Sequence, residues 1–235
     1  MPNNAKAAAL IAAAGSSRRM EGRDKLWLPL AGRIVLARTL DVFESSPLLD
    51  TIVLVVNPER VEEAAALCRE EGWRRVAAVV AGGARRQDSV RNGLAALANL
   101  APETQWVIIH DGARPLVTSS LLEAGLRAAQ EHQAAVAAVP VKDTIKTVEQ
   151  VLVHSTIERS TLQAVQTPQV FSFPLIYAAH TSPEAQAEDA TDDAALLERL
   201  GLPVAVFPGS YTNLKITTRE DLLVAEALLQ GGETL

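Results

Sequence analysis

The stretch AALIAAAGSSRRMEGRDK, residues 8–25, gives the strongest indication of the fold. Its small and aliphatic side chains lead to Gly15, and the cations Arg18, Arg19 and Lys25 follow. A buried strand that opens into a loop of small residues lets the backbone approach a ligand, and the cations suit a polyanion such as a nucleoside triphosphate. Because Gly15 stands alone, the spacing matches neither G-x-x-x-x-G-K-[ST] nor G-x-G-x-x-G. The stretch therefore predicts a phosphate-binding loop of another kind.

The rest of the chain continues the alternation of strand and helix patterns. Aliphatic and β-branched runs predict strands, and amphipathic segments predict helices between them. This repeat of βα units predicts an α/β fold: a Rossmann-like, doubly wound, mostly parallel sheet with right-handed crossovers. The predicted strands are residues 7–14, 51–56, 75–80, 106–110, 134–139 and 204–207, and the predicted helices are 34–45, 58–71, 87–100, 119–132, 174–181, 192–200 and one that begins near Thr218 with a capping-box pattern.

Residues 140–169 interrupt this alternation. Polar and apolar side chains alternate there, with a turn-like Glu149-Gln150, which predicts an extended, protruding β-arm. A two-stranded arm is marginally stable alone in water, so it packs either on a second subunit or back on its own domain. The sequence shows no internal repeat or linker. Residues 1–235 are therefore predicted to be a single domain with an arm.

Composition narrows the class of protein. With 235 residues, 48% of them hydrophobic, the chain can bury a substantial core, and its net charge of −6 disfavours nucleic acid as the main partner. Cys68 is the only cysteine, which excludes internal disulfides and cysteine-based zinc sites. The apolar run 5–14 is too short to span a bilayer and continues into the loop, so we expect no membrane span or signal peptide. A cytoplasmic protein is expected.

Four predicted loops carry the residues that indicate chemistry. They are residues 15–25, residues 81–90 (AGGARRQDSV), residues 107–115 (VIIHDGARP) and residues 209–217 (GSYTNLKIT). Ligands of open α/β sheets bind at the carboxyl ends of the strands, so we expect these loops to border one site. In the second loop, the free amides of a helix start and the Ser89 hydroxyl can hold a polar or anionic group.

The charged residues of these loops have more than one interpretation. Asp111 follows an apolar strand directly and is badly placed for core packing, so it is a candidate ligand of Mg²⁺ held against phosphate oxygens. Lys215 is either a site residue or an ordinary surface lysine. Arg85 and Arg86 are expected to form a solvated pair. His110 is expected to be packed at a strand end rather than to act as a ligand.

Asp192 and Asp193 also allow two interpretations. They either form a second metal site or open a helix, where the helix dipole favours acidic residues. The chain contains no G-x-S-x-G, so a nucleophile elbow is excluded.

Several motifs occur together in the order typical of one family. They are AAAGSSRRM and DK, GGARRQDSV, HDGARP, PVKDTIK, QTPQ, ATDD and NLKIT. With them the chain resembles the 2-C-methyl-D-erythritol 4-phosphate cytidylyltransferases over residues 6 to 229. The first loop alone indicates only the nucleotidyltransferase superfamily, whereas D-G-A-R-P combined with V-K-D-T and Q-T-P-Q is far more specific.

The resemblance implies a reaction of the non-mevalonate isoprenoid pathway. A polyol phosphate oxygen attacks the α-phosphorus of CTP and pyrophosphate leaves, without a covalent enzyme intermediate, so the protein acts by positioning and charge stabilisation. The family motifs assign Mg²⁺ to Asp111. They assign phosphate stabilisation to Arg19, Lys25 and Lys215, and contacts with cytosine and ribose to the backbone of Ala13, Ala14 and Gly15 together with Gly83 and Ser89.

The resemblance also gives the arm a role. In the family it embraces a second subunit and completes that subunit's polyol-phosphate site, which implies a homodimer. The residues that match this site are Arg114, Thr144, Arg159, Thr167 and Thr191. Arg159 is the strongest of these candidates, since a guanidinium can bind a phosphate through two hydrogen bonds.

The chain departs from the family pattern at three positions. Leu26 stands where a glutamine is usual, Ala84 where some members carry an acid, and Thr212 where aspartate is frequent. A cytidylyltransferase for ribitol 5-phosphate is the nearest alternative. A silent nucleotide-binding regulator would be expected to lose the phosphate-binding cations, and a dehydrogenase would need more glycines in the first loop.

Overall fold

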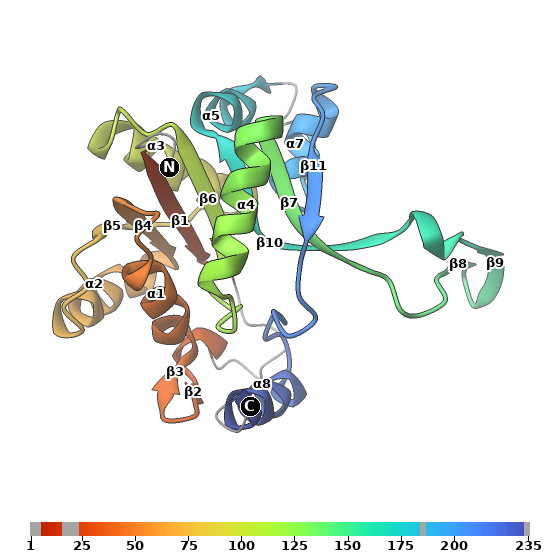
Figure 1. The fold of residues 1–235 in the computed structure, drawn as a ribbon, viewed down its shortest axis with the longest axis horizontal. Helices are drawn as coiled ribbons and strands as arrows, with labels where there is room; N and C mark the ends of the chain where they lie inside the picture. The colour runs from red at the N-terminus through yellow and green to blue at the C-terminus, as the bar shows by residue number, and fades with distance from the viewer. Residues whose placement is uncertain (1–5, 16–23, 184–186, 233–235) are drawn as a thin grey trace.

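A seven-stranded sheet forms the centre of the computed structural model, which describes residues 6–15, 24–183 and 187–232. The strand order is β11-β7-β10-β6-β1-β4-β5 (Figure 1). Only β10 runs antiparallel to its neighbours β6 and β7, and the other pairings are parallel. The predicted, mostly parallel α/β fold is confirmed. The strands are β1 (Ala7–Ala13), β4 (Thr51–Val56), β5 (Val76–Ala81), β6 (Trp106–Asp111), β7 (Ala134–Pro140), β10 (Gln163–Ser172) and β11 (Ala205–Pro208).

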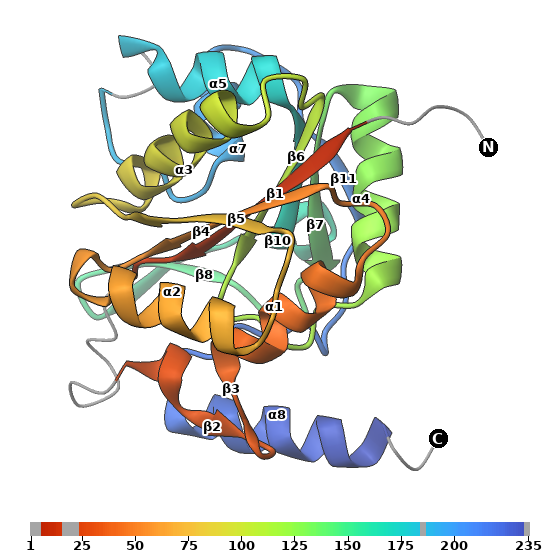
Figure 2. The same cartoon turned by 90° about the vertical axis from the view of Figure 1, so that its left-hand side faces the viewer.

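Helices cover both faces of this sheet (Figure 2). Alternate residues of β1 enter opposite cores, with Ala9 and Ile11 on one side and Ala8 and Leu10 on the other. This is why the strand is apolar throughout rather than alternating. One core contains α1 (Val35–Ser45), α2 (Val61–Glu70) and α4 (Ser119–His132), and the other contains α3 (Arg86–Leu100), α5 (Phe173–Thr181) and α7 (Ala194–Arg199).

The remaining elements lie around this core. The small hairpin β2 (Pro29–Leu30) and β3 (Arg33–Ile34) lies beside the last helix, α8 (Arg219–Gly232). The expected capping box opens α8, because Asp221 Oδ2 accepts a hydrogen bond from the Thr218 amide at 2.8 Å and the Asp221 amide donates to Thr218 Oγ1 at 3.4 Å. Short 3₁₀ turns occupy Lys25–Trp27, Pro58–Arg60 and Arg159–Thr161.

The predicted helices and strands are recovered with small shifts at their ends. Two agree to the residue, the strand 51–56 and the helix 119–132. The helix predicted from residue 58 begins three residues later, at Val61, because Pro58–Arg60 form a 3₁₀ turn capped by Asn57. None of the helices in the described part of the chain is long and apolar enough to cross a membrane.

The arm is shorter than predicted. Strands β8 (Lys146–Glu149) and β9 (Leu152–Thr156) form an antiparallel hairpin that projects from the sheet (Figure 1). Gln150, with φ of +53°, makes the expected turn. The second half of the predicted arm, however, is strand β10 of the main sheet. The alternation of polar and apolar side chains suggested an exposed segment, but Gln166 and Gln169 are buried within the sheet, so the protruding part spans residues 141–162 and not 140–169.

Candidate functional site

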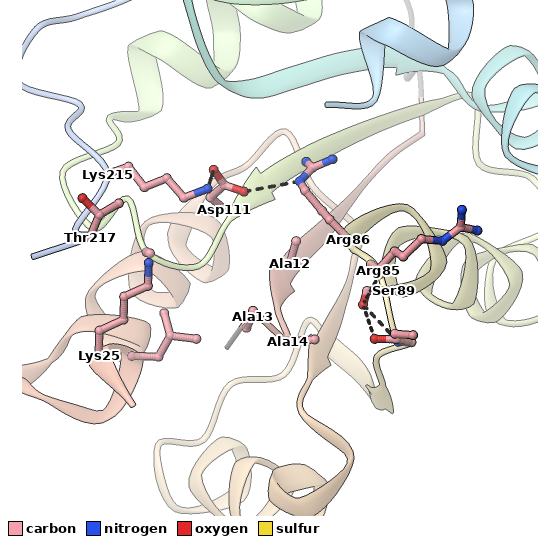
Figure 3. Close-up of a pocket in the computed structure, with 15 residues that line it drawn as sticks. Ala12, Ala13, Ala14, Lys25, Arg85, Arg86, Ser89, Asp111, Lys215 and Thr217 are labelled. Atoms are coloured by element: carbon pink, nitrogen blue, oxygen red, sulfur yellow. Dashed lines mark hydrogen bonds and ion pairs between the residues drawn. The ribbon is translucent and has the colours of Figure 1, made fainter. Parts of the chain in front are cut away.

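A pocket of about 460 Å³ opens at the carboxyl ends of β1 and β6 (Figure 3). All four predicted loops line it. Gly15 follows β1, Lys25 begins the 3₁₀ turn Lys25–Trp27, Ser89 lies at the start of α3, Asp111 at the end of β6, and Lys215 in the segment before α8. The expectation that these loops border one site is confirmed, because parallel strands bring their carboxyl ends to the same edge.

The lining of this pocket is rich in positive charge. Four cations and one carboxylate belong to it in the described part of the chain: Lys25, Arg85, Arg86 and Lys215 against Asp111. The whole chain is acidic, so this local excess of cations is opposite in sign to the net charge of −6. An arrangement of this kind suits a polyanionic ligand.

Asp111 lies at the centre of the charged cluster. Its Oδ2 is 2.8 Å from Lys215 Nζ and 3.5 Å from Arg114 Nε, and its Oδ1 is 3.8 Å from Arg86 Nε. Burial alone would raise the pKa of this carboxyl, but the three cations outweigh it and hold the pKa well below its usual range. Asp111 therefore stays ionised, and Lys215 belongs to the cluster and is not an ordinary surface lysine.

Arg86 is not the solvated residue that the sequence suggested. Its Nη2 lies 2.7 Å from Asp193 Oδ2, and Asp193 is fully buried. Burial lowers the pKa of Arg86, but the negative charges of Asp193 and Asp111 raise it by more than burial lowers it, so the net shift is upward. The Asp193 pKa falls to about 2, because Arg86 and a hydrogen bond with His180 at 3.1 Å outweigh the cost of burial. No local pattern signalled this pair, whose members are 107 positions apart.

The solvated interpretation fits Arg85. Its side chain is 36% exposed and reaches the partly buried carboxylate of Asp88 at 2.9 Å and the exposed carboxylate of Asp189 at 3.1 Å. Asp192 likewise follows the simpler of its two interpretations, since its Oδ1 accepts from the Ala195 amide at 3.0 Å at the start of α7. No group of three or more His, Cys, Asp or Glu side chains that could hold a metal occurs within residues 6–15, 24–183 and 187–232.

Two glycines allow close approaches of the second loop, Gly82 to the residue after β1 and Gly83 to the start of α3. A Cβ at Gly82 would lie 2.3 Å from the Cβ of Ala14, and one at Gly83 would lie 2.5 Å from the Cβ of Asp88. The Gly83 amide donates to Ser89 Oγ at 3.0 Å. Ser89 thus holds the loop against the helix start while lining the pocket. A larger residue at Gly82 would push the second loop away from Ala14, and one at Gly83 would push it away from the start of α3.

His110 has the packed position that was expected. It is fully buried, its Nε2 is 3.2 Å from the Arg114 carbonyl oxygen, and its ring is tilted against Phe43. Burial lowers the pKa of His110 to about 4, so the ring is neutral at physiological pH. His110 supports the loop behind the pocket.

The residues predicted to bind the polyol phosphate fall into two groups. Thr167 lies beside the pocket, where its Oγ1 accepts from the Asp111 amide at 3.0 Å, and Arg114 is 3.5 Å from the Asp111 carboxylate. Thr144 and Arg159 lie exposed on the arm, and Thr191 is exposed before α7. The single chain does not bring these three into the pocket lining.

Two further residues bear on the predicted site. Arg19 lies outside the described residues. Asn213, which the sequence did not single out, is buried, and its Nδ2 donates to the Thr167 carbonyl oxygen at 2.8 Å. The backbone carbonyl oxygen of Asn213 accepts a hydrogen bond from Arg114 Nη1 at 2.7 Å. Asn213 therefore ties the loop of Lys215 to β10 and to the segment after β6. The N-L-K-I-T motif, which Asn213 begins, was the feature of the sequence that could have identified it as a site residue.

Comparisons with known proteins agree with this arrangement. The sequence model of the family described as 2-C-methyl-D-erythritol 4-phosphate cytidylyltransferase matches residues 7–231. A protein of that name from Dehalococcoides mccartyi strain CBDB1 is 49% identical over 230 residues, covering 97% of this chain and 98% of the relative. One from Geobacter metallireducens is 45% identical over 228 residues, covering 94% and 97%.

Solved structures show the same likeness. The 4-diphosphocytidyl-2C-methyl-D-erythritol synthase of Anaerococcus prevotii superposes with a TM-score of 0.84 at 33% identity, over 96% of each chain. The 2-C-methyl-D-erythritol 4-phosphate cytidylyltransferase of Thermus thermophilus gives a TM-score of 0.75 at 33% identity, over 94% of this chain and 98% of the other. The chain belongs to the family of 2-C-methyl-D-erythritol 4-phosphate cytidylyltransferases.

Proposed function

We propose that this chain transfers the cytidylyl group of CTP to 2-C-methyl-D-erythritol 4-phosphate, giving CDP-methylerythritol and pyrophosphate for isoprenoid precursor synthesis. This is the activity named in its family and relatives. The observation that carries it is the pocket at the carboxyl ends of the strands, lined by four cations and one carboxylate among the described residues. Both substrates carry negatively charged phosphate groups, and the excess of cations in the pocket lining favours binding both at once.

The proposed chemistry is a direct displacement. An oxygen of the methylerythritol phosphate attacks the α-phosphorus of CTP, the bond to the bridging oxygen breaks, and pyrophosphate leaves with the bonding electrons. Two anionic groups must approach each other, so fixed positive charge at the α-phosphate lowers the barrier. Lys25 and Lys215 supply that charge from one side of the pocket (Figure 3). Arg19 is assigned the same role on its family motif.

The other side of the pocket is suited to the nucleoside. Ala13, Ala14, Gly15, Gly83 and Ser89 line it and present backbone groups and one hydroxyl. In Figure 3, Ala14 and Ser89 lie across the pocket from Lys25 and Lys215. A pocket that forms hydrogen bonds to a base edge rejects bases whose donors and acceptors differ. We therefore place cytosine and ribose here, with the triphosphate extending toward the two lysines.

We propose that Mg²⁺ enters this site together with CTP. Asp111 is ionised, but three cations surround its carboxylate. That environment fits a metal only when phosphate oxygens provide most of the ligands, which is the arrangement Mg²⁺ prefers. Once bound, the ion offsets charge on the phosphates. Asp111 is the residue that would hold the ion. An ion bound to Asp111 would replace Lys215 as the partner of its carboxylate, and the Lys215 ammonium group could then reach a phosphate.

We further propose a homodimer formed through the arm. The hairpin exposes apolar side chains, with Val151 90% and Leu152 72% exposed. Such a hairpin is marginally stable alone, and burying these side chains against a second copy would stabilise it. In the dimer, Thr144 and Arg159 complete the polyol-phosphate site of the partner, where Thr167 and Thr191 also contribute.

We place the reaction in the cytoplasm, in keeping with a single buried cysteine, Cys68.

A pyrophosphate-release assay tests the proposed function. CTP, UTP and ATP are each combined with 2-C-methyl-D-erythritol 4-phosphate or ribitol 5-phosphate in the presence of Mg²⁺. We expect the highest kcat/KM for CTP with methylerythritol phosphate. A higher value with ribitol 5-phosphate would overturn the acceptor, and a preference for UTP or ATP would overturn the cytosine pocket.

A further inference from the structure

Tyr211 holds the chain at the point where the arm leaves the sheet. Its phenol donates a hydrogen bond of 2.7 Å to the carbonyl oxygen of Pro140, the last residue of β7. The ammonium group of Lys142, two residues further along, lies 3.6 Å from the centre of the Tyr211 ring. One side chain therefore makes two different contacts with the root of the arm, a hydrogen bond and a cation–π contact.

The returning half of the arm joins the same contact. Arg159 Nη1 donates to the carbonyl oxygen of Lys142 at 2.7 Å, so the residue predicted to bind the polyol phosphate rests on the segment that Tyr211 holds. Lys142 thus connects the two side chains, one through its ammonium group and the other through its carbonyl oxygen.

The loop that carries Tyr211 is itself fixed to the sheet. Gln166 of β10 donates to the Ser210 carbonyl oxygen at 2.9 Å and accepts from the Ser210 amide at 3.3 Å. Asn213 donates to the Thr167 carbonyl oxygen at 2.8 Å. Hydrogen bonds to β10 therefore hold the loop on both sides of Tyr211, at Ser210 and at Asn213, and Tyr211 can act as a fixed support for the arm.

We propose that Tyr211 is a positioning residue: it sets the direction in which the arm leaves the sheet and thereby places Arg159 for the phosphate of the acceptor bound by the partner subunit. This inference rests on the proposed function, and specifically on the arm completing the partner's site. A guanidinium binds phosphate best through two parallel hydrogen bonds, which tolerate little displacement. Because Arg159 rests on the carbonyl oxygen of Lys142, a shift of the segment that Tyr211 holds, where the protruding arm begins (Figure 1), moves the Arg159 guanidinium with it.

A mixed dimer separates this role from an effect on Lys215 in the same loop. One subunit carries Lys215→Ala and is inactive, so the measured turnover comes from the other subunit, which uses the arm of the inactive one. Tyr211→Phe, which removes the hydroxyl and keeps the ring, is placed on either subunit in turn. Tyr177→Phe, at the only other tyrosine of the chain, is the matched control.

We expect Tyr211→Phe on the inactive subunit to raise the KM for methylerythritol phosphate about three- to tenfold, the effect of one lost hydrogen bond, and to leave the KM for CTP and the kcat nearly unchanged. On the active subunit it should have little effect, as should Tyr177→Phe on either. An effect only on the active subunit would overturn the inference, because Tyr211 would then act through its own site.

Arg159→Ala on the inactive subunit separates the proposed role of Tyr211 from the proposed role of the arm in the partner's site. If it raises the KM for methylerythritol phosphate while Tyr211→Phe at the same place does not, the positioning role of Tyr211 is wrong and the proposed arm function stands. If neither variant has an effect from the inactive subunit, the arm does not complete the partner's site, and both proposals fail.

Discussion

Replacing Arg86 by alanine removes a positive charge that lies between two buried carboxylates. Its Nη2 is 2.7 Å from Asp193 Oδ2, and its Nε is 3.8 Å from Asp111 Oδ1. Asp111 keeps Lys215 at 2.8 Å, whereas the carboxylate of Asp193 would keep only the hydrogen bond with His180 at 3.1 Å among its side-chain contacts within the described residues. The change therefore leaves one ionised group buried without a cation.

The expected loss in the free energy of unfolding follows from that geometry. The Asp193 pKa of about 2 lies well below its ordinary 3.8. At about 1.36 kcal/mol for each pH unit of that difference, this corresponds to about 2–3 kcal/mol of stabilisation at neutral pH. Removing one partner of a buried ion pair costs about 3–5 kcal/mol in other proteins. We therefore expect Arg86→Ala to lower the free energy of unfolding by about 3 kcal/mol, within the range that these two figures span.

The pH dependence of this loss has a definite sign. The folded pKa of Asp193 is depressed, so its contribution is fully present above the unfolded pKa of 3.8 and is lost as the pH falls toward about 2. The difference in the free energy of unfolding between wild type and Arg86→Ala should be largest near neutral pH and shrink on acidification. Protonation of Asp193 removes the unpaired buried charge that destabilises the variant.

Urea unfolding followed by circular dichroism at several pH values measures this difference. Arg85→Ala is the matched control, because Arg85 is the adjacent arginine and solvent reaches both of its carboxylate partners, 14% of the Asp88 side chain and 79% of the Asp189 side chain, whereas Asp193 is fully buried. Solvent screens these pairs, so Arg85→Ala should lower the stability less than Arg86→Ala. Equal losses for the two variants, or a gap that does not change with pH, would refute the assigned role of Arg86.

Three further outcomes are expected. Lys215→Ala should lower kcat by about 10²–10³-fold with an unchanged circular dichroism spectrum, as loss of charge at the reacting phosphate predicts; near-normal turnover would contradict its role. Gly83→Ala, whose Cβ would lie 2.5 Å from that of Asp88, should raise the KM for CTP more than that for the acceptor in steady-state kinetics. Equal changes in the two constants would place the loop away from the nucleotide. Thr218→Ala should cost about 1 kcal/mol in urea unfolding by removing the cap of α8, and an unchanged midpoint would show that the cap is dispensable.

Local pattern was sufficient for most of the fold. The strand 51–56 is apolar throughout because both faces of the sheet are covered, and that property is legible in six consecutive residues. The convergence of four loops also followed, since carboxyl ends of parallel strands share one edge. Asp111 stood out because a carboxylate directly after a buried strand has no place in a core.

Long-range contacts explain what the sequence did not reveal. Strand β10 contains Gln166 and Gln169, which look like exposed residues, but Gln166 bonds to Ser210 and Gln169 donates to Asp192 at 2.7 Å. These partners lie far along the chain, so no local pattern shows that the amides are satisfied. The pairing of Arg86 with Asp193 was hidden for the same reason.

The phosphorus NMR spectrum of a completed reaction tests the central claim most directly. CTP and 2-C-methyl-D-erythritol 4-phosphate are incubated with the protein and Mg²⁺, and the ³¹P signals are followed. We predict that the monoester signal of the acceptor disappears while a pair of coupled diphosphate signals and pyrophosphate grow in equal amounts. Release of pyrophosphate with CMP, while the acceptor monoester remains, would show hydrolysis instead of transfer and would contradict it.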